Sequence, residues 1–258
     1  MPRLPRPTRR TKTPFRYGGL ITSVLLAVGV GWLAHYGLAR EWLVGLVVLL
    51  IIAVESLPYR TNLKTDWLMA MPLILGGASV AVIIALSPRA LTQIVVVAVY
   101  AAWRGWRAAK PERTQSFSEL LVMLALVYEA IFLAAAVWRT PAWICLVLLY
   151  AASYILVYQG LHIRGERLAR VLAATWALIV VQVSWVFLNW LVTYVLVGNY
   201  FIIPQAALIL TGLAYCFGGI YLSQRQQALT RMRLAEYLLI ALLLVIIVAS
   251  STPWRGTL

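Results

Sequence analysis

Apolar residues fill this chain in nine long runs that are separated by short polar stretches. The runs cover roughly 17–36, 42–58, 67–86, 90–104, 119–138, 142–160, 171–197, 200–222 and 234–250. A helix needs about 20 apolar residues to cross the hydrocarbon core of a bilayer, and inside lipid the backbone must satisfy its own hydrogen bonds. The pattern therefore predicts an all-α polytopic integral membrane protein, a bundle of nine transmembrane helices.

Basic residues are distributed unevenly between the polar stretches. Most of the 22 Lys and Arg fall in the N-terminal tail and in the second, fourth, sixth and eighth connections. Cytoplasmic connections carry an excess of Lys and Arg, so we predict an N-in, C-out topology. Residues 1–16 are then a disordered basic cytoplasmic tail, residues 17–250 the nine-helix transmembrane domain, and residues 251–258 a short external tail. The first run also has the basic lead of a signal peptide, but its apolar part of about 18 residues exceeds the usual 7–15 and favours an uncleaved anchor.

Composition narrows the class of protein further. Hydrophobic residues make up 63% of the 258 residues and charged residues 12%, which leaves no stretch for a separate soluble domain. The net charge of +14 is compatible with nucleic-acid binding, but basic residues in alternate short connections are typical of membrane orientation instead. The expected partners are membrane lipids, with anionic headgroups at the cytoplasmic rim, and another membrane protein, with no nucleic acid. A prokaryotic cytoplasmic membrane fits this pattern best.

The residue types that most membrane enzymes need are scarce. Asp66 is the only aspartate, whereas diphosphate chemistry at a divalent metal needs clustered carboxylates. The two histidines, His35 and His162, lie near opposite membrane faces in the predicted topology, and Cys145 and Cys216 form no CxxC pair. We therefore expect no enzyme activity, no cofactor and no metal site.

One carboxylate, Glu129, lies in the middle of the run 119–138. At about 1.5 Å per residue it would sit roughly 15 Å from either interface, where a charge costs on the order of 2.5–3.5 kcal/mol. No Lys or Arg lies within a run at that depth. Glu129 is therefore either a protonated, hydrogen-bonded group in a packed interior or a site for a proton, a cation or a ligand.

The seventh run carries a second polar feature. Thr175, Gln182 and Asn189 are spaced by seven residues, with Thr193 one turn further, so they share one helix face. We predict that this face lies toward protein, not lipid. The favoured interpretation of this face is hydrogen bonding between helices. The alternative is that it lines a water-filled path or a ligand cavity.

Aromatic residues add a third feature. Tyr150, Tyr154 and Tyr158 recur at every fourth position of the sixth run, so their hydroxyls form one stripe that could meet Glu129 or the polar face of the seventh run. Most tryptophans fall at predicted run ends, as in the aromatic belts of membrane proteins. Trp185 and Trp190 lie inside the predicted seventh run and depart from that rule.

Two functions follow from these features. The first is a non-enzymatic membrane protein that acts as a structural or accessory component, with Glu129 sealed against a neighbour such as Tyr154 or Gln182. The alternative is a small-solute or proton-coupled transporter or channel, which would use Glu129 with the Gln182 and Asn189 face. A cavity that reaches Glu129 would favour the second.

Overall fold

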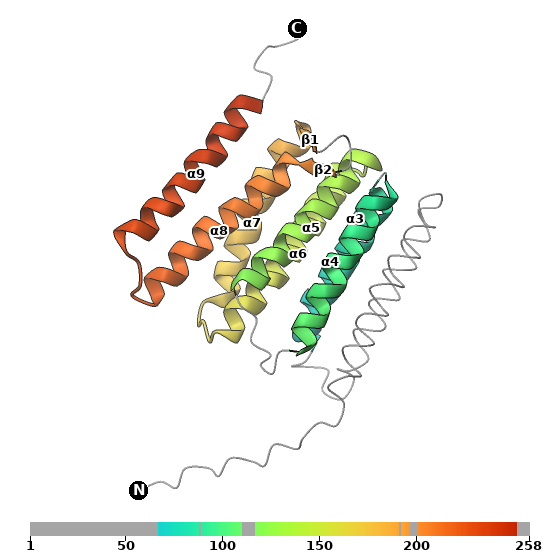
Figure 1. Ribbon diagram of the computed structural model, residues 1–258. Helices are drawn as coiled ribbons and strands as arrows, with labels where there is room; N and C mark the ends of the chain where they lie inside the picture. Colours follow the sequence, from blue (N-terminus) through green and yellow to red (C-terminus); the bar gives the residue numbers. More distant parts are fainter. Residues whose placement is uncertain (1–66, 88, 110–116, 191, 197–200, 252–258) are drawn as a thin grey trace, which may run out of the picture.

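The computed structural model describes residues 67–87, 89–109, 117–190, 192–196 and 201–251. Figure 1 shows these residues as a set of helices lying side by side, with one short hairpin at one end. The elements are α3 (Trp67–Leu86), α4 (Ala90–Ala109), α5 (Phe117–Val137), α6 (Ala142–Ile163), α7 (Ala169–Asn189), β1 (Thr193–Leu196), β2 (Phe201–Pro204), α8 (Gln205–Arg225) and α9 (Arg231–Ser251). The predicted tail 1–16, the first two runs and residues 252–258 lie outside the described part of the chain.

Four of the described helices, α5, α6, α7 and α8, are long and apolar enough to cross a membrane. The helices α3 and α4 contain shorter apolar stretches, Met71–Leu86 and Ala90–Gly105. The helical class is confirmed, and the apolar helices support a membrane-embedded protein. The count of nine crossings and the N-in, C-out orientation remain predictions.

The structure corrects the predicted helix 171–197. The helix α7 ends at Asn189, and Thr193–Leu196 pairs antiparallel with Phe201–Pro204. Thr, Tyr and Val are frequent in strands, and Pro204 ends the second strand because proline has no N–H to donate to the ladder. Pro204 is the N-cap of α8, which therefore begins at Gln205 and not at residue 200.

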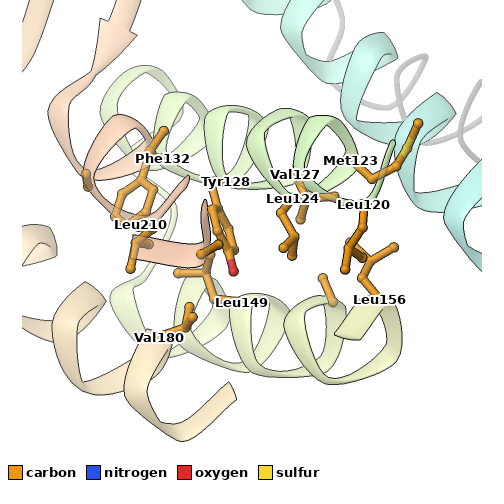
Figure 2. Close-up of a cluster of buried hydrophobic side chains, with 14 residues drawn as sticks. Leu120, Met123, Leu124, Val127, Tyr128, Phe132, Leu149, Leu156, Val180 and Leu210 are labelled. Atoms are coloured by element: carbon orange, nitrogen blue, oxygen red, sulfur yellow. The ribbon is translucent and has the colours of Figure 1, made fainter. Parts of the chain in front are cut away.

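The helix α5 is the central element of the described bundle. It packs against α3, α6 and α8 and also contacts β2. Its buried side chains form the middle of an apolar cluster that includes Phe132 from α5, Leu149 and Leu156 from α6, and Val180 from α7; several of them are drawn in Figure 2. The side of α5 on which a residue lies therefore determines which of these elements its side chain contacts.

The helix α9 packs principally on α8. Two glycines of α8 permit this contact, because a Cβ at Gly212 would lie 2.6 Å from the side chain of Leu244 and one at Gly219 would lie 2.6 Å from the ring of Tyr237. Small residues that let two helices approach closely are a common means of association in lipid.

Tyr128 joins three helices through its hydroxyl group. Its side chain is fully buried and points from α5 toward α6 (Figure 2). The hydroxyl lies 3.1 Å from Ser153 Oγ of α6 and accepts a hydrogen bond from Trp176 Nε1 of α7 at 3.3 Å. The three polar groups satisfy one another in a setting where water is excluded, so the contact holds α5, α6 and α7 in one register.

We expect Tyr128→Phe to destabilise the protein by about 1–2 kcal/mol, because hydrogen bonds between membrane helices contribute roughly 0.6 kcal/mol each on average and two partners lose theirs. The free energy of unfolding is measured by titrating the purified protein in detergent with sodium dodecyl sulfate.

Tyr154→Phe is the matched control, since no hydrogen bond of the Tyr154 hydroxyl is found within the described residues. Equal stabilities of the two variants would contradict the role given to Tyr128.

Candidate functional site

Glu129 follows Tyr128 on α5 but lies on another side of the helix. Successive residues of an α-helix are rotated by about 100°, so Tyr128 is directed toward α6 while Glu129 is directed away from it. Glu129 is twelve residues from the first residue of α5 and eight from the last, which places it about 18 Å and 12 Å from the two helix ends. Glu129 therefore lies in the middle part of an apolar helix.

A cavity of about 310 Å³ lies against Glu129, and we name it the Glu129 cavity. Its wall comes from five parts of the chain, namely the end of α3, the start of α4, the middle of α5, β2 and α8. Most of the wall is apolar, with Ile202 and Ile203 of β2 among its members. The polar members besides Glu129 are Ser87 and Thr92.

The turn between α3 and α4 fixes the polar side of the Glu129 cavity. Ser87 Oγ donates a hydrogen bond to the carbonyl of Ile83 at 2.7 Å. Gln93 Nε2 donates to the carbonyls of Ile84 and Ser87 at 3.2 and 3.1 Å. The bonds to Ile83 and Ile84 satisfy carbonyls in the last turn of α3, which have no partner within the helix. The turn therefore holds Ser87 in place at the cavity wall.

The side chain of Glu129 is half-buried. Among the described residues it makes no hydrogen bond and no ion pair. A carboxyl group in this position can take up and release a proton, or its oxygens can hold a small cation together with the hydroxyl groups of Ser87 and Thr92. Within the same residues no three His, Cys, Asp or Glu side chains gather as metal ligands would.

The structure does not bring the predicted polar face of α7 to Glu129. No residue of α6 or α7 lines the Glu129 cavity. Thr175, Gln182 and Asn189 are exposed, and Asn189 Nδ2 donates to the Trp185 carbonyl of its own helix at 2.8 Å. Among the described residues this face is therefore turned outward, and its contact with protein remains a prediction. Thr193 does not extend the face, because it belongs to β1.

Tyr154 is likewise separate from Glu129. Its ring stacks between those of Tyr150 and Tyr158, with centroids 6.3 and 5.8 Å apart, and Tyr158 stacks on His162 at 5.5 Å. The predicted tyrosine stripe is confirmed as a ladder along α6, but it meets neither Glu129 nor Gln182. Trp190 and Trp185 lie at the end of α7 because that helix is shorter than predicted, so both now fit the rule for aromatic belts.

Ser87, Thr92 and the isoleucines of β2 are the cavity residues that sequence reasoning missed. A short connection between two apolar runs places its polar residues beside the ends of both helices. That signal was present at Ser87 and Thr92. The contribution of β2 is not visible in the sequence, because the apolar pattern predicts a helix over its residues.

A polar cluster lies at the connection between α6 and α7. Gly165 has φ of 68° and ends α6, with its N–H donating to the carbonyl of His162 at 2.9 Å; glycine is favoured there because a Cβ would be strained. This turn places Glu166 against α8, where Tyr221 Oη donates to Glu166 Oε2 at 2.6 Å and Arg225 forms an ion pair with the same carboxylate.

Charge and hydrogen bonding shift the ionisation of this cluster. The hydrogen bond from Tyr221 lowers the pKa of Glu166 most, partial desolvation opposes it, and the charge of Arg225 lowers it further. Partial burial lowers the pKa of Arg164, and the neighbouring charge of Arg225 acts in the same direction. Folding therefore favours the ionised form of Glu166.

Comparison of the chain with protein-family models, with curated proteins and with solved structures found no match.

The lowered pKa of Glu166 predicts a pH-dependent stability. Its contribution is fully present above the ordinary carboxyl value of 4.5 and is lost as the pH falls through the lower value of the folded state. The difference in melting temperature between the wild type and Glu166→Gln should therefore be largest near pH 7 and shrink below about pH 4.5.

Melting curves in detergent across that pH range make the measurement. Tyr221→Phe, added to Glu166→Gln, should change little, because the two groups act on each other. A difference that stays constant from neutral to acidic pH would contradict the assignment.

Proposed function

We propose that this protein is a non-enzymatic integral membrane transporter or channel that takes up a proton or a small cation at Glu129. The observation that carries the proposal is the Glu129 cavity, whose apolar wall contains a carboxyl group from the middle of α5 and two hydroxyl-bearing residues from the α3–α4 connection and the first turn of α4. Placing an ionisable side chain within a membrane segment costs free energy. An apolar residue would pack there without that cost, so the carboxyl group indicates a function.

The composition of the cavity wall supports a site that changes its charge. The apolar residues around Glu129 disfavour a bare carboxylate, so the group is stable either with a proton bound or with a cation beside it. Ser87 and Thr92 supply oxygen atoms at the same wall, as small hard cations prefer. A group that alternates between these two states can couple proton release to cation binding.

The structural or accessory role is the second candidate. This role predicts that Tyr154 or Gln182 contacts Glu129 and shields it, and neither residue lines the Glu129 cavity. The exposed position of Gln182 and Asn189 favours it in another way, because polar side chains on an outward face of a membrane helix are satisfied by a partner helix. Both roles place the protein in a membrane, for which we propose the prokaryotic cytoplasmic membrane, with the basic connections inside and in contact with anionic headgroups.

Reconstitution into liposomes tests the transport proposal. A potassium gradient with valinomycin imposes a membrane potential, and a pH-sensitive dye inside the vesicles reports proton entry. Wild-type vesicles should acidify faster than empty ones, and Glu129→Gln should reduce the rate to that of empty vesicles, because the amide cannot bind a proton.

Glu236→Gln is the matched control, since Glu236 is exposed on α9 and accepts a hydrogen bond from Tyr215 at 2.7 Å, apart from the Glu129 cavity. It should leave the flux unchanged. Ala125→Leu, which adds bulk to the cavity wall while leaving Glu129 in place, should also lower the flux. Equal rates for wild type and Glu129→Gln, with or without a sodium gradient, would exclude a transport role for Glu129.

A further inference from the structure

A second cavity of about 270 Å³ lies nearer the first turns of α5. It is lined by residues of α5, α6, α7 and α8 and by Arg164, the C-cap of α6, and we name it the Arg164 cavity. Apolar side chains dominate its wall, among them Leu121, Val157 and Phe217. The Arg164 cavity contains no residue of the Glu129 cavity, and the two meet different sides of α5.

Trp176 lines this cavity, but its indole N–H is not available to an occupant. It belongs to the wall, yet its Nε1–H is already engaged with the Tyr128 hydroxyl at 3.3 Å. An indole has no other hydrogen-bond donor, so what it can offer an occupant is an apolar surface. The interior is therefore suited to hydrocarbon and poorly suited to a polar solute.

Positive charge gathers at the end of the Arg164 cavity that adjoins the connection between α6 and α7. Arg164 is part of the wall, and its guanidinium carbon lies 5.9 Å from the ring centroid of Phe117. Tyr221 also lines the cavity and holds Glu166, whose carboxylate is paired with Arg225. The one carboxylate of this cluster is thus engaged by Arg225, and within the described residues no ion pair of Arg164 is found.

Two glycines allow the aromatic and aliphatic wall to close around this space. A Cβ at Gly218 would lie 2.6 Å from the Phe117 ring, and one at Gly160 would lie 3.1 Å from the side chain of Leu120. Gly218 therefore lets the Phe117 ring approach α8 closely, and the same ring contacts the Arg164 guanidinium. The result is a largely apolar space with a cation in its wall.

We propose that the Arg164 cavity binds one acyl chain of an anionic amphiphile, whose phosphate or carboxylate pairs with Arg164. The cavity is complementary to both parts of such an amphiphile. Its apolar wall can contact the acyl chain, and the guanidinium of Arg164 can form two hydrogen bonds to a phosphate or carboxylate group. The connection between two membrane-capable helices, where Arg164 lies, is also the level at which headgroups lie. This site is independent of Glu129.

Fluorescence quenching with brominated chains tests the proposal on the full-length protein in detergent. The probes are phosphatidylglycerol and phosphatidylcholine with the same dibrominated acyl chains, and dibromostearate as a free fatty acid. Phosphatidylglycerol or dibromostearate should quench saturably, and the saturable part should disappear in Trp176→Phe. Saturation by phosphatidylglycerol alone identifies a phospholipid site, and saturation by dibromostearate alone identifies a fatty-acid site.

Arg164→Gln should weaken this binding about tenfold or more, since one charge-assisted contact is lost, and Arg164→Lys should retain part of the affinity. Arg167→Gln is the matched control, because Arg167 is exposed in the same connection and does not line the cavity. Val157→Phe, which fills the cavity, should abolish saturable quenching while the variant elutes as the wild type does in size-exclusion chromatography.

Saturable quenching by phosphatidylcholine as strong as that by the anionic probes, no saturable quenching by either anionic probe, or equal losses in Arg164→Gln and Arg167→Gln would overturn the proposal. Glu129→Gln should leave the affinity unchanged. Failure of the lipid site and failure of the transport proposal are therefore distinguishable.

Discussion

A polar group inside lipid must find its partner within the protein, and the hydroxyl of Tyr128 meets that requirement for three helices at once. It contacts Ser153 of α6 and Trp176 of α7 while its ring fills the apolar cluster around α5. Each of the three groups would be unsatisfied if its helix moved. The position of α5 relative to α6 and α7 follows from this contact, and so do the positions of the cavities on its two sides.

Glu129 lies at nearly the same depth as Tyr128, but it has no hydrogen-bond partner among the described residues and lines a cavity. One residue along the chain is enough to turn it away from the Tyr128 contact, because a helix rotates by about 100° per residue. It reaches instead a space bounded by α3, α4, β2 and α8. The chain thus places a permanently satisfied polar group on one side of α5 and an available carboxyl group on the other, so packing and the chemistry we propose are carried by different faces of one helix.

Hydrophobic patterning predicted the helices well where the apolar runs were uninterrupted, because a membrane helix is specified by length and apolarity. It failed at residues 190–204, because Leu, Val and Ile make that stretch apolar as a whole, while Thr193 and Tyr194 favour strands and Pro204 favours a helix start. It identified Glu129 but assigned it the wrong neighbours. Periodicity shows that Gln182 and Asn189 share a face, but it does not show toward which helix that face is turned. That choice depends on the contacts of α6 and α5 with the opposite side of α7.

The attachment of α9 through Gly212 and Gly219 also has a consequence for biosynthesis. The other described helices make their main contacts among themselves, whereas α9 packs principally on α8. A bundle translated from the N-terminus can therefore complete its apolar cluster before α9 leaves the ribosome. The helix α9 then packs on the preformed surface of α8. Gly212 and Gly219 leave room there for Leu244 and Tyr237, which fixes the rotation of α9 about its own axis.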